Sequence, residues 1–463
     1  MAAYRLKLRL LTVVLFAIAA LVSYSALQQS SRLFRQLEVD SLEEFPGQPH
    51  PRDVKPTDHK KRGIPVVDKG KSNEKPGDGP QFERNHPGNV SGAVQPKCSA
   101  TVTILVPSMR PFKAWREYEH LMSEFSHHST QLGDANLRSL HLQCPSQRCD
   151  VDIRVTTDEE YLNTSDAVIV NMFPNALKDN LLDFLSHLRQ ILHPKTHWFF
   201  YGVESPQMMT YWDPNIAEIQ YHHSITYHSE ADIRLPYGRY LPNRRSDQRS
   251  STTTRDWSAN KTALIAWMAS NCDNTFWPRY EFVIELKKHV PVDMYGGCGT
   301  LTCLPAMSEK CTNLVAGYKF YLSLENAECD EYITEKVWSN ALLQGAVPVV
   351  YGGRKEAYQQ ILPPKSFIHI GDFDSVQHLA SYLQILDQND NMYNMYHAWR
   401  ERGSVQAVYP PLDPQLFCEV VPFVLTPPPA FRTVKNSGYF KACKSRTGTF
   451  VDKDSLKSFV AWE

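Results

Sequence analysis

Residues 318–353 constrain the fold more than any other part of the chain. They comprise a buried strand pattern (KFYLSL), a polar loop, an amphipathic helix pattern, a turn at Gly345 and a second buried strand pattern (AVPVVY). Two consecutive buried strands joined through a helix are typical of a parallel sheet with its helices packed on the faces. This segment therefore predicts an α/β fold.

The same alternation occurs on both sides of a polar stretch at residues 243–258. Before it, strands are predicted at 101–106, 151–155, 167–170 and 197–201, with a helix at 180–192; after it, strands at 262–269 and 292–295, with helices at 277–289 and 332–343. We expect two α/β domains, residues 98–250 and 258–415, separated by a cleft, and a C-terminal tail from 416 to 463. Ligands of such sheets bind at the carboxyl ends of the strands.

The N-terminal region has a different character. Basic residues in positions 1–9 precede an uncharged apolar run at 10–27, which is close to the minimum length that spans a bilayer. We expect a transmembrane signal-anchor with a cytosolic tail, and a cleaved signal peptide is the alternative. Residues 28–97 contain few large apolar residues, so they predict a disordered stem.

Two further features agree with a body outside the cytosol. Glycosylation sequons begin at Asn89, Asn163 and Asn260, and all ten cysteines follow the apolar run. Cys144 and Cys149 are close enough in sequence to form a local disulfide, and a second cysteine group lies at 298, 303 and 311. A zinc site is the weaker explanation of that group because no CxxC pair is present.

The charge pattern excludes other classes of function. A net charge of −1 argues against a nucleic-acid-binding protein. Two Asp-x-Asp triplets, at 150–152 and 372–374, are better explained as chance carboxylates than as a metal clamp, so no metal site is predicted. The chain has no GxSxG, GxGxxG or P-loop motif.

The loop and first helical turn after residue 324 concentrate polar side chains. A helix N-terminus suits a phosphate group, and Lys336 adds a full positive charge. Glu335 could accept hydrogen bonds from a ribose. A capped, solvated first turn is the alternative explanation of the same spacing.

Residues 318–336 (YKFYLSLENAECDEYITEK) closely resemble the signature of the α1,3-fucosyltransferases. Residues 269–279 (ASNCDNTFWPR) and 292–296 (VDMYG) are similar to a second run of that family. Weaker similarity covers residues 200–206 (FYGVESP) and 227–238 (YHSEADIRLPYG).

The resemblance implies two Rossmann-like domains facing a cleft (GT-B type) and inverting transfer of L-fucose from GDP-β-L-fucose. The acceptor would be the 3-hydroxyl of an N-acetylglucosamine in a glycoprotein or glycolipid glycan. It implies no tightly bound cofactor, and a divalent metal only as a stimulant without a ligand site. It also implies a lumenal catalytic domain anchored in the Golgi membrane as a single-pass type II protein.

The resemblance also assigns roles to six residues. Arg279 and Lys336 would neutralise the diphosphate, Glu335 would bind the ribose, and Asn326 and Tyr332 would line the donor pocket. Glu204, at a strand end, would be the general base. A strand-end carboxylate that only accepts hydrogen bonds from backbone N–H groups is the other interpretation of Glu204.

The sequence leaves other functions open. These are a catalytically inactive glycan-binding relative, a transferase for another nucleotide sugar, and a transferase acting on polypeptide. The chain departs from the family pattern at His228 and Glu230, where Arg and Asp are common. It also lacks a CxxC pair at Cys418, so we expect Cys418 to pair elsewhere, for example with Cys443.

Overall fold

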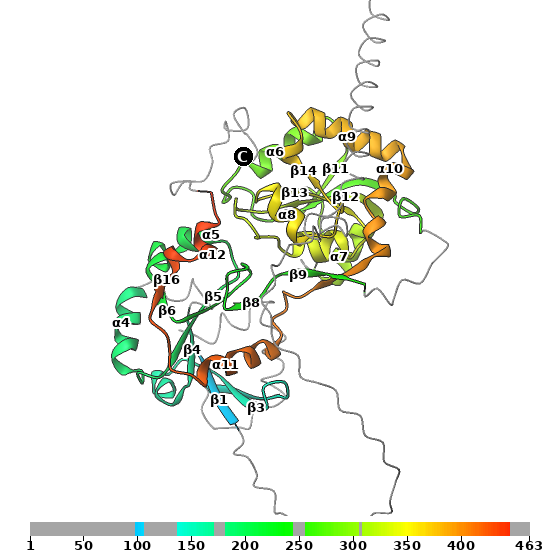
Figure 1. Cartoon of the computed structure of the whole chain (residues 1–463). Helices are drawn as coiled ribbons and strands as arrows, with labels where there is room; N and C mark the ends of the chain where they lie inside the picture. Colours follow the sequence, from blue (N-terminus) through cyan, green and yellow to red (C-terminus); the bar gives the residue numbers. More distant parts are fainter. Residues whose placement is uncertain (1–97, 106–136, 171–180, 244–254, 305–307, 445–463) are drawn as a thin grey trace, which may run out of the picture. The chain divides into compact units, whose positions relative to one another are not determined.

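The computed structural model describes residues 98–105, 137–170, 181–243, 255–304 and 308–444, all within one compact unit, Pro96–Glu463 (Figure 1). The predicted tail, signal-anchor and stem, together with Asn89, lie outside these residues. Among the helices that the structure describes, none combines the length and the apolar character needed to cross a bilayer.

The first part of the chain forms a seven-stranded sheet in the order β2-β3-β1-β4-β5-β7-β8. Neighbouring strands are parallel except β2 and β3, which form an antiparallel hairpin at one edge. The central strands are buried on both faces, which explains their continuous apolar pattern. The bounds are β1 Cys98–Leu105, β2 Leu137–Cys144, β3 Cys149–Thr156, β4 Ala167–Val170, β5 His197–Gly202, β7 His223–Thr226 and β8 Ile233–Arg234, with helices α4 Leu181–Ile191 and α5 Pro206–Trp212.

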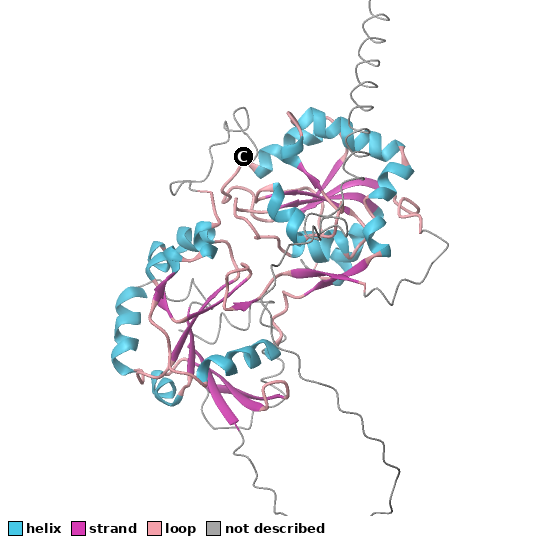
Figure 2. Ribbon diagram, viewed as in Figure 1, coloured by secondary structure: helices cyan, strands magenta, loops and turns pink. Residues whose placement is uncertain are grey.

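The second part forms a five-stranded, fully parallel sheet in the order β11-β10-β12-β13-β14. Figure 2 shows helices on both sides of its strands. The bounds are β10 Ala263–Met268, β11 Val292–Tyr295, β12 Tyr318–Leu324, β13 Val347–Tyr351 and β14 Ile368–His369, with α6 Arg279–Lys287, α7 Glu309–Leu314, α8 Lys355–Ile361, α9 Val376–Gln388 and α10 Asp390–Met395. The predicted α/β class is confirmed. The helix expected at 332–343 is a short π-helix, η7, over Lys336–Leu342.

The last part of the chain returns to the first part and forms two small two-stranded sheets with it. Strand β15 (Gly403–Ala407) pairs with β9 (Gly238–Pro242), and β16 (Arg432–Thr433) pairs with β6 (Gln220–Tyr221). Residues predicted as a C-terminal tail thus include ordered elements. These are the 3-10 helix η10 (Pro414–Val420) and the helices α11 (Val421–Val424) and α12 (Gly438–Lys441); the other 3-10 helices are η2 Glu159–Thr164, η4 Pro214–Glu218, η6 Val315–Gly317, η8 Ile370–Asp372, η9 Ala398–Glu401 and η11 Val434–Asn436.

All ten cysteines form disulfides, which agrees with the prediction of disulfides and corrects two pairings. The bridges are Cys98–Cys149, Cys144–Cys418, Cys272–Cys298, Cys303–Cys311 and Cys329–Cys443. The local Cys144–Cys149 bridge that the sequence allowed does not form: Cys149 lies opposite both Cys98 and Cys144 in its two strand ladders, and it bridges Cys98. The expected Cys418–Cys443 bridge is wrong because η10 brings Cys418 to the β2–β3 hairpin, whereas Cys443 lies beside the loop after β12.

Candidate active site

Two loops at the carboxyl ends of parallel strands carry the candidate site. Strand β5 ends at Gly202, two residues before Glu204, and β12 ends at Leu324, directly before Glu325 and Asn326. The chain turns sharply after Glu204, because Ser205 is the N-cap of α5 and its Oγ accepts a hydrogen bond from the backbone N–H of Met208 (3.2 Å). The Glu204 side chain is therefore fixed at the start of a helix and next to a sheet edge.

One carboxylate oxygen of Glu204 is held by three donors. Its Oε1 accepts from the backbone N–H of Ser205 (2.9 Å), from Nδ2 of Asn326 (3.4 Å) and from the hydroxyl of Tyr332. Burial, and then the negative charge of Glu204, raise the pKa of Tyr332 well above its ordinary value, so its hydroxyl remains a donor. The backbone carbonyl of Glu204 accepts from the hydroxyl of Tyr439 (2.5 Å). The sequence left open whether Glu204 is a general base or only accepts hydrogen bonds from backbone N–H groups. In the structure it accepts hydrogen bonds from two side chains as well as from one backbone N–H group.

A second group surrounds Lys336. Its Nζ lies 3.0 Å from Oε2 of Glu325 and 3.1 Å from Oε1 of Glu335, and donates to Oγ1 of Thr334 (2.8 Å). Burial alone would lower the pKa of Lys336, but the two carboxylates raise it, so the ammonium stays charged. Glu325 is fully buried, which raises its pKa against the opposing effect of Lys336. Burial alone would raise the pKa of Glu335, but Lys336 lowers it.

Arg279, the first residue of α6, is buried between the loops. Its Nη1 donates to the carbonyl of Leu324 (2.9 Å) and its Nη2 to the carbonyl of Asn271 (2.7 Å). Burial lowers the pKa of Arg279, and the carboxylate of Glu325 opposes that effect. Among the described residues, Nε of Arg279 and Oδ1 of Asn326 are buried without a hydrogen-bond partner. Such groups are rare in native proteins and are often satisfied by water or a ligand.

The structure thus brings Glu204, Asn326 and Tyr332 into direct contact, and places Glu335 and Lys336 in a second contacting group. Three neighbours were not among the predicted site residues: Glu325, Thr334 and Tyr439. Glu325 and Thr334 lie within the 318–336 motif, so the motif itself was a signal for them. Tyr439 lies in the predicted tail and had no sequence signal, because its contact with Glu204 spans 235 positions.

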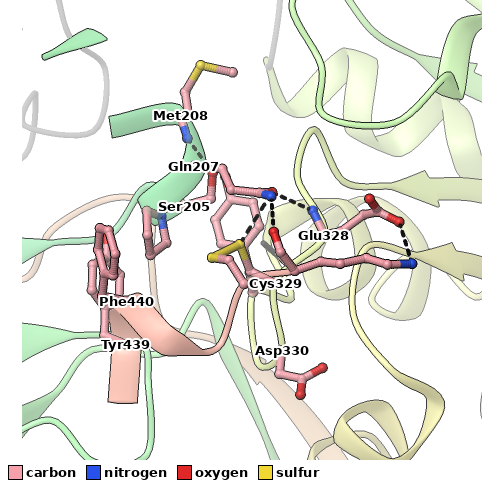
Figure 3. Close-up of a disulfide and its surroundings, with 12 residues drawn as sticks. Ser205, Gln207, Met208, Glu328, Cys329, Asp330, Tyr439 and Phe440 are labelled. Carbon is pink, nitrogen blue, oxygen red and sulfur yellow. Dashed lines mark hydrogen bonds and ion pairs between the residues drawn. A yellow bond between two sulfur atoms is a disulfide. The ribbon is translucent and has the colours of Figure 1, made fainter. Parts of the chain in front are cut away.

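Helix α5 is also tied to the loop after β12. Oε1 of Gln207 accepts from the backbone N–H of Glu328 (3.0 Å), and Nε2 of Gln207 donates to the carbonyl of Lys444 (2.8 Å). Figure 3 shows these contacts beside the Cys329–Cys443 disulfide. The element that starts after Glu204, the loop that carries Asn326 and the end of the described chain are therefore joined.

The other predicted sites are at the surface. Asn163 and Asn260 are exposed, and Asn260 has a positive φ of 67°. No group of three or more His, Cys, Asp or Glu side chains in the described parts of the chain is arranged to hold a metal ion.

Comparison with known proteins shows which family part of this site is similar to. Residues 258–436 match the family model of glycosyltransferase family 10 (fucosyltransferase), C-terminal part. We refer to these residues as the family 10 domain because of this match. The domain contains five of the six predicted site residues, and Glu204 lies before it in the chain.

Known fucosyltransferases are similar to this chain in sequence. Glycoprotein 3-alpha-L-fucosyltransferase A of Drosophila melanogaster is 32% identical over 274 residues, which are 58% of this chain and 50% of that protein. Alpha-(1,3)-fucosyltransferase 4 of Mus musculus is 36% identical over 212 residues, 46% of this chain and 48% of that protein. The chain therefore spans about half the length of these curated relatives. A solved structure of an alpha1,3-fucosyltransferase with GDP aligns with 72% of this chain and 92% of its own, at 17% identity and a TM-score of 0.43.

Proposed function

We propose that this protein transfers L-fucose from GDP-β-L-fucose, with inversion, to the 3-hydroxyl of an N-acetylglucosamine in a glycoprotein or glycolipid glycan. The observation that carries this proposal is the contact between Glu204 and the family 10 loop, through Tyr332 and Asn326. It joins a carboxylate that follows a strand of the first sheet to the loop that leads into Lys336 and adjoins Arg279. The names of the similar fucosyltransferases support the choice of sugar and linkage.

Glu204 is proposed as the general base. Its three described contacts all fall on Oε1, so Oε2 is the oxygen available to an acceptor hydroxyl. As the acceptor oxygen forms its bond to the fucose anomeric carbon, its proton passes to Oε2. The bond from that carbon to the diphosphate oxygen breaks, and GDP leaves with the electron pair.

Lys336, Arg279 and Glu335 are proposed to bind the donor. Lys336 remains charged between Glu325 and Glu335, and can share its Nζ with a diphosphate oxygen. One N–H of each Nη group of Arg279 donates to a backbone carbonyl, so it would act on the diphosphate through its charge, its remaining Nη hydrogens and its unpaired Nε. The sequence assigned Tyr332 to the donor pocket, but its hydroxyl binds Glu204, so we propose that Tyr332 positions the base. Asn326 keeps its proposed place in the donor pocket, where its unpaired Oδ1 would face the donor.

The setting of the reaction is also part of the proposal. We propose that the two sheets act as Rossmann-like halves of a GT-B-type enzyme, with the donor held by the second. The apolar run at residues 10–27 and the disulfides support a lumenal domain anchored in the Golgi membrane, because disulfides persist in oxidising compartments.

The test uses the full-length chain with GDP-fucose and a panel of N-acetyllactosamine, sialylated lactosamine and N-glycan-core acceptors. Products are read by mass and linkage, and GDP binding is measured by calorimetry. Glu204→Gln should keep GDP affinity and lose transfer by about 10²–10⁴-fold, the usual contribution of a general base. Transfer by Glu204→Gln at the wild-type rate would remove Glu204 as the base. GDP binding by the wild type with no transfer to any acceptor would refute the proposed activity.

A further inference from the structure

A cavity of about 440 Å³ lies over the first sheet, beneath the returning C-terminal segment. Its floor includes Phe200 of β5 with Ser224 and Thr226 of β7. Phe200 lies directly opposite Ser224 in the parallel ladder, so these side chains share one face of the sheet. The volume falls in the range of about 300–1,000 Å³ that is typical of small-molecule sites.

Aromatic side chains form much of the remaining wall. Tyr221 and Tyr439 are buried, whereas Phe431 is 41% exposed although it is a large apolar side chain. Together with Phe200 they surround a space whose polar groups come mainly from β7 and from residues 432–438. Apolar rings combined with a few hydrogen-bonding groups suit a ligand that has both C–H faces and hydroxyl groups.

The charges of the wall indicate which ligand fits. Arg432 is occupied, because its Nη2 binds the carboxylate of Asp232 and donates to the carbonyl of His222 (2.9 Å). The hydroxyl of Ser224 also donates to Asp232 (2.9 Å). In contrast, the carboxylate of Glu230 makes no hydrogen bond or ion pair within the described chain. The wall therefore presents a free hydrogen-bond acceptor with negative charge.

A glycine allows that carboxylate to line the cavity. A Cβ atom on Gly438 would lie 2.2 Å from Oε2 of Glu230, so a larger residue there would displace the carboxylate from this position. The neighbouring His228 does not compensate the charge, because its Nε2 lies 3.7 Å from Oε1 of Glu331. A neutral ligand rich in hydroxyl groups is favoured over an acidic one, since a second carboxylate would be repelled by Glu230.

We propose that this cavity binds a neutral saccharide unit of the acceptor glycan, beyond the sugar that receives fucose. The inference rests on the proposed transferase function. Tyr439 connects the two places, because its ring lines the cavity while its hydroxyl binds the backbone carbonyl of Glu204 (2.5 Å). The cavity would thus select extended neutral glycans, with Glu230 accepting hydrogen bonds from sugar hydroxyls and the aromatic walls covering the ring.

Two variants of the full-length chain test the cavity. Ala231→Phe fills it from a half-buried wall position, and Glu230→Ala removes the free carboxylate from an exposed one. The matched control is Lys435→Ala. Lys435 lies in the same C-terminal segment and forms a surface ion pair with Glu218, but it does not line the cavity. Calorimetry with GDP confirms that each variant is folded.

Binding is measured first, by saturation-transfer NMR in the presence of GDP. The probes are a lactosamine tetrasaccharide, the N-glycan core pentasaccharide and the methyl glycoside of N-acetylglucosamine. We expect Ala231→Phe to abolish binding of the extended oligosaccharide that the wild type binds. We expect Glu230→Ala to weaken it roughly tenfold, the effect of losing one hydrogen bond to a charged group. The methyl glycoside and the Lys435→Ala control should behave as in the wild type.

Transfer kinetics separate the two proposals. In Ala231→Phe and Glu230→Ala, KM for the extended acceptor should rise while kcat and the kinetics with the methyl glycoside stay unchanged. Extended-acceptor binding by Ala231→Phe at wild-type strength would overturn the cavity proposal, as would a wild type that binds GDP but none of the oligosaccharides. Cavity-dependent binding with no transfer by the wild type would instead refute the proposed transferase function alone.

Discussion

Replacing Tyr332 by phenylalanine tests how the proposed base is held. The change removes one hydroxyl that donates to Oε1 of Glu204 and leaves the donors Ser205 and Asn326 in place. A hydrogen bond to a charged group contributes about 1.5–3 kcal/mol. At about 1.4 kcal/mol per tenfold change in rate, kcat should fall about 10- to 150-fold. KM for GDP-fucose should stay within about threefold, because Tyr332 contacts the base and its hydroxyl is not free for the donor.

The assay is steady-state transfer with both substrates varied. Tyr393→Phe is the matched control, because its buried hydroxyl donates to the carbonyl of Lys319 (2.9 Å), away from Glu204. That variant should lose about 1 kcal/mol of stability and keep its kcat. An unchanged kcat in Tyr332→Phe, or a raised KM for GDP-fucose with normal kcat, would refute the positioning role and restore Tyr332 as a donor-binding residue.

Three further predictions concern charge, pH and the covalent frame. Lys336→Met leaves two carboxylates unpaired, so it should lower the free energy of unfolding by about 3 kcal/mol and weaken GDP binding; urea unfolding and calorimetry measure the two effects. Burial lowers the pKa of His222 and of His223 to about 4. The unfolded chain therefore binds protons first as pH falls below about 6.5, and stability should drop between pH 6.5 and 4, by about 2 kcal/mol per histidine at pH 5; equal urea midpoints at pH 7 and pH 5 would contradict this. Replacing both Cys329 and Cys443 by serine opens a loop with a sequence separation of 114 and should cost about 5 kcal/mol in the chain-entropy treatment, and an unchanged thermal midpoint would argue against it.

Much of the fold could be predicted because its strands are buried on both faces. The apolar run at β12 predicts a strand from the sequence alone, and in the structure all of its residues are buried. The helix after it was harder to predict: apolar spacing indicated an α-helix, whereas the chain forms a π-helix beginning at Lys336. Spacing at 3.6 residues does not distinguish the two over so short a length.

The local neighbours of the site residues were also accessible from the sequence. Glu325, Thr334, Glu335 and Lys336 lie within one short motif, so their contact follows from local geometry. The contact of Tyr439 with Glu204 joins positions 235 apart and depends on how the C-terminal segment packs. No periodicity in the sequence encodes such packing.

Disulfide pairing failed for the same reason. Cys144 is five positions from Cys149 but bridges Cys418, at a separation of 274. Closeness in sequence therefore favoured the wrong partner, because the folded chain also brings Cys98 next to Cys149 and Cys418 next to Cys144.

The return of the C-terminal segment to the first part of the chain affects how the protein is made. Strand β6 (Gln220–Tyr221) has its antiparallel partner in β16 (Arg432–Thr433), which is synthesised about 200 residues later. At about 5–20 residues per second, translation of the intervening chain takes roughly 10–40 s. During that time the half of the protein that emerges first lacks the cover for one face, while all strands of the second sheet are already present. The first half is therefore completed last, and a chain that ends near residue 430 lacks β16 although it contains every strand of the second sheet.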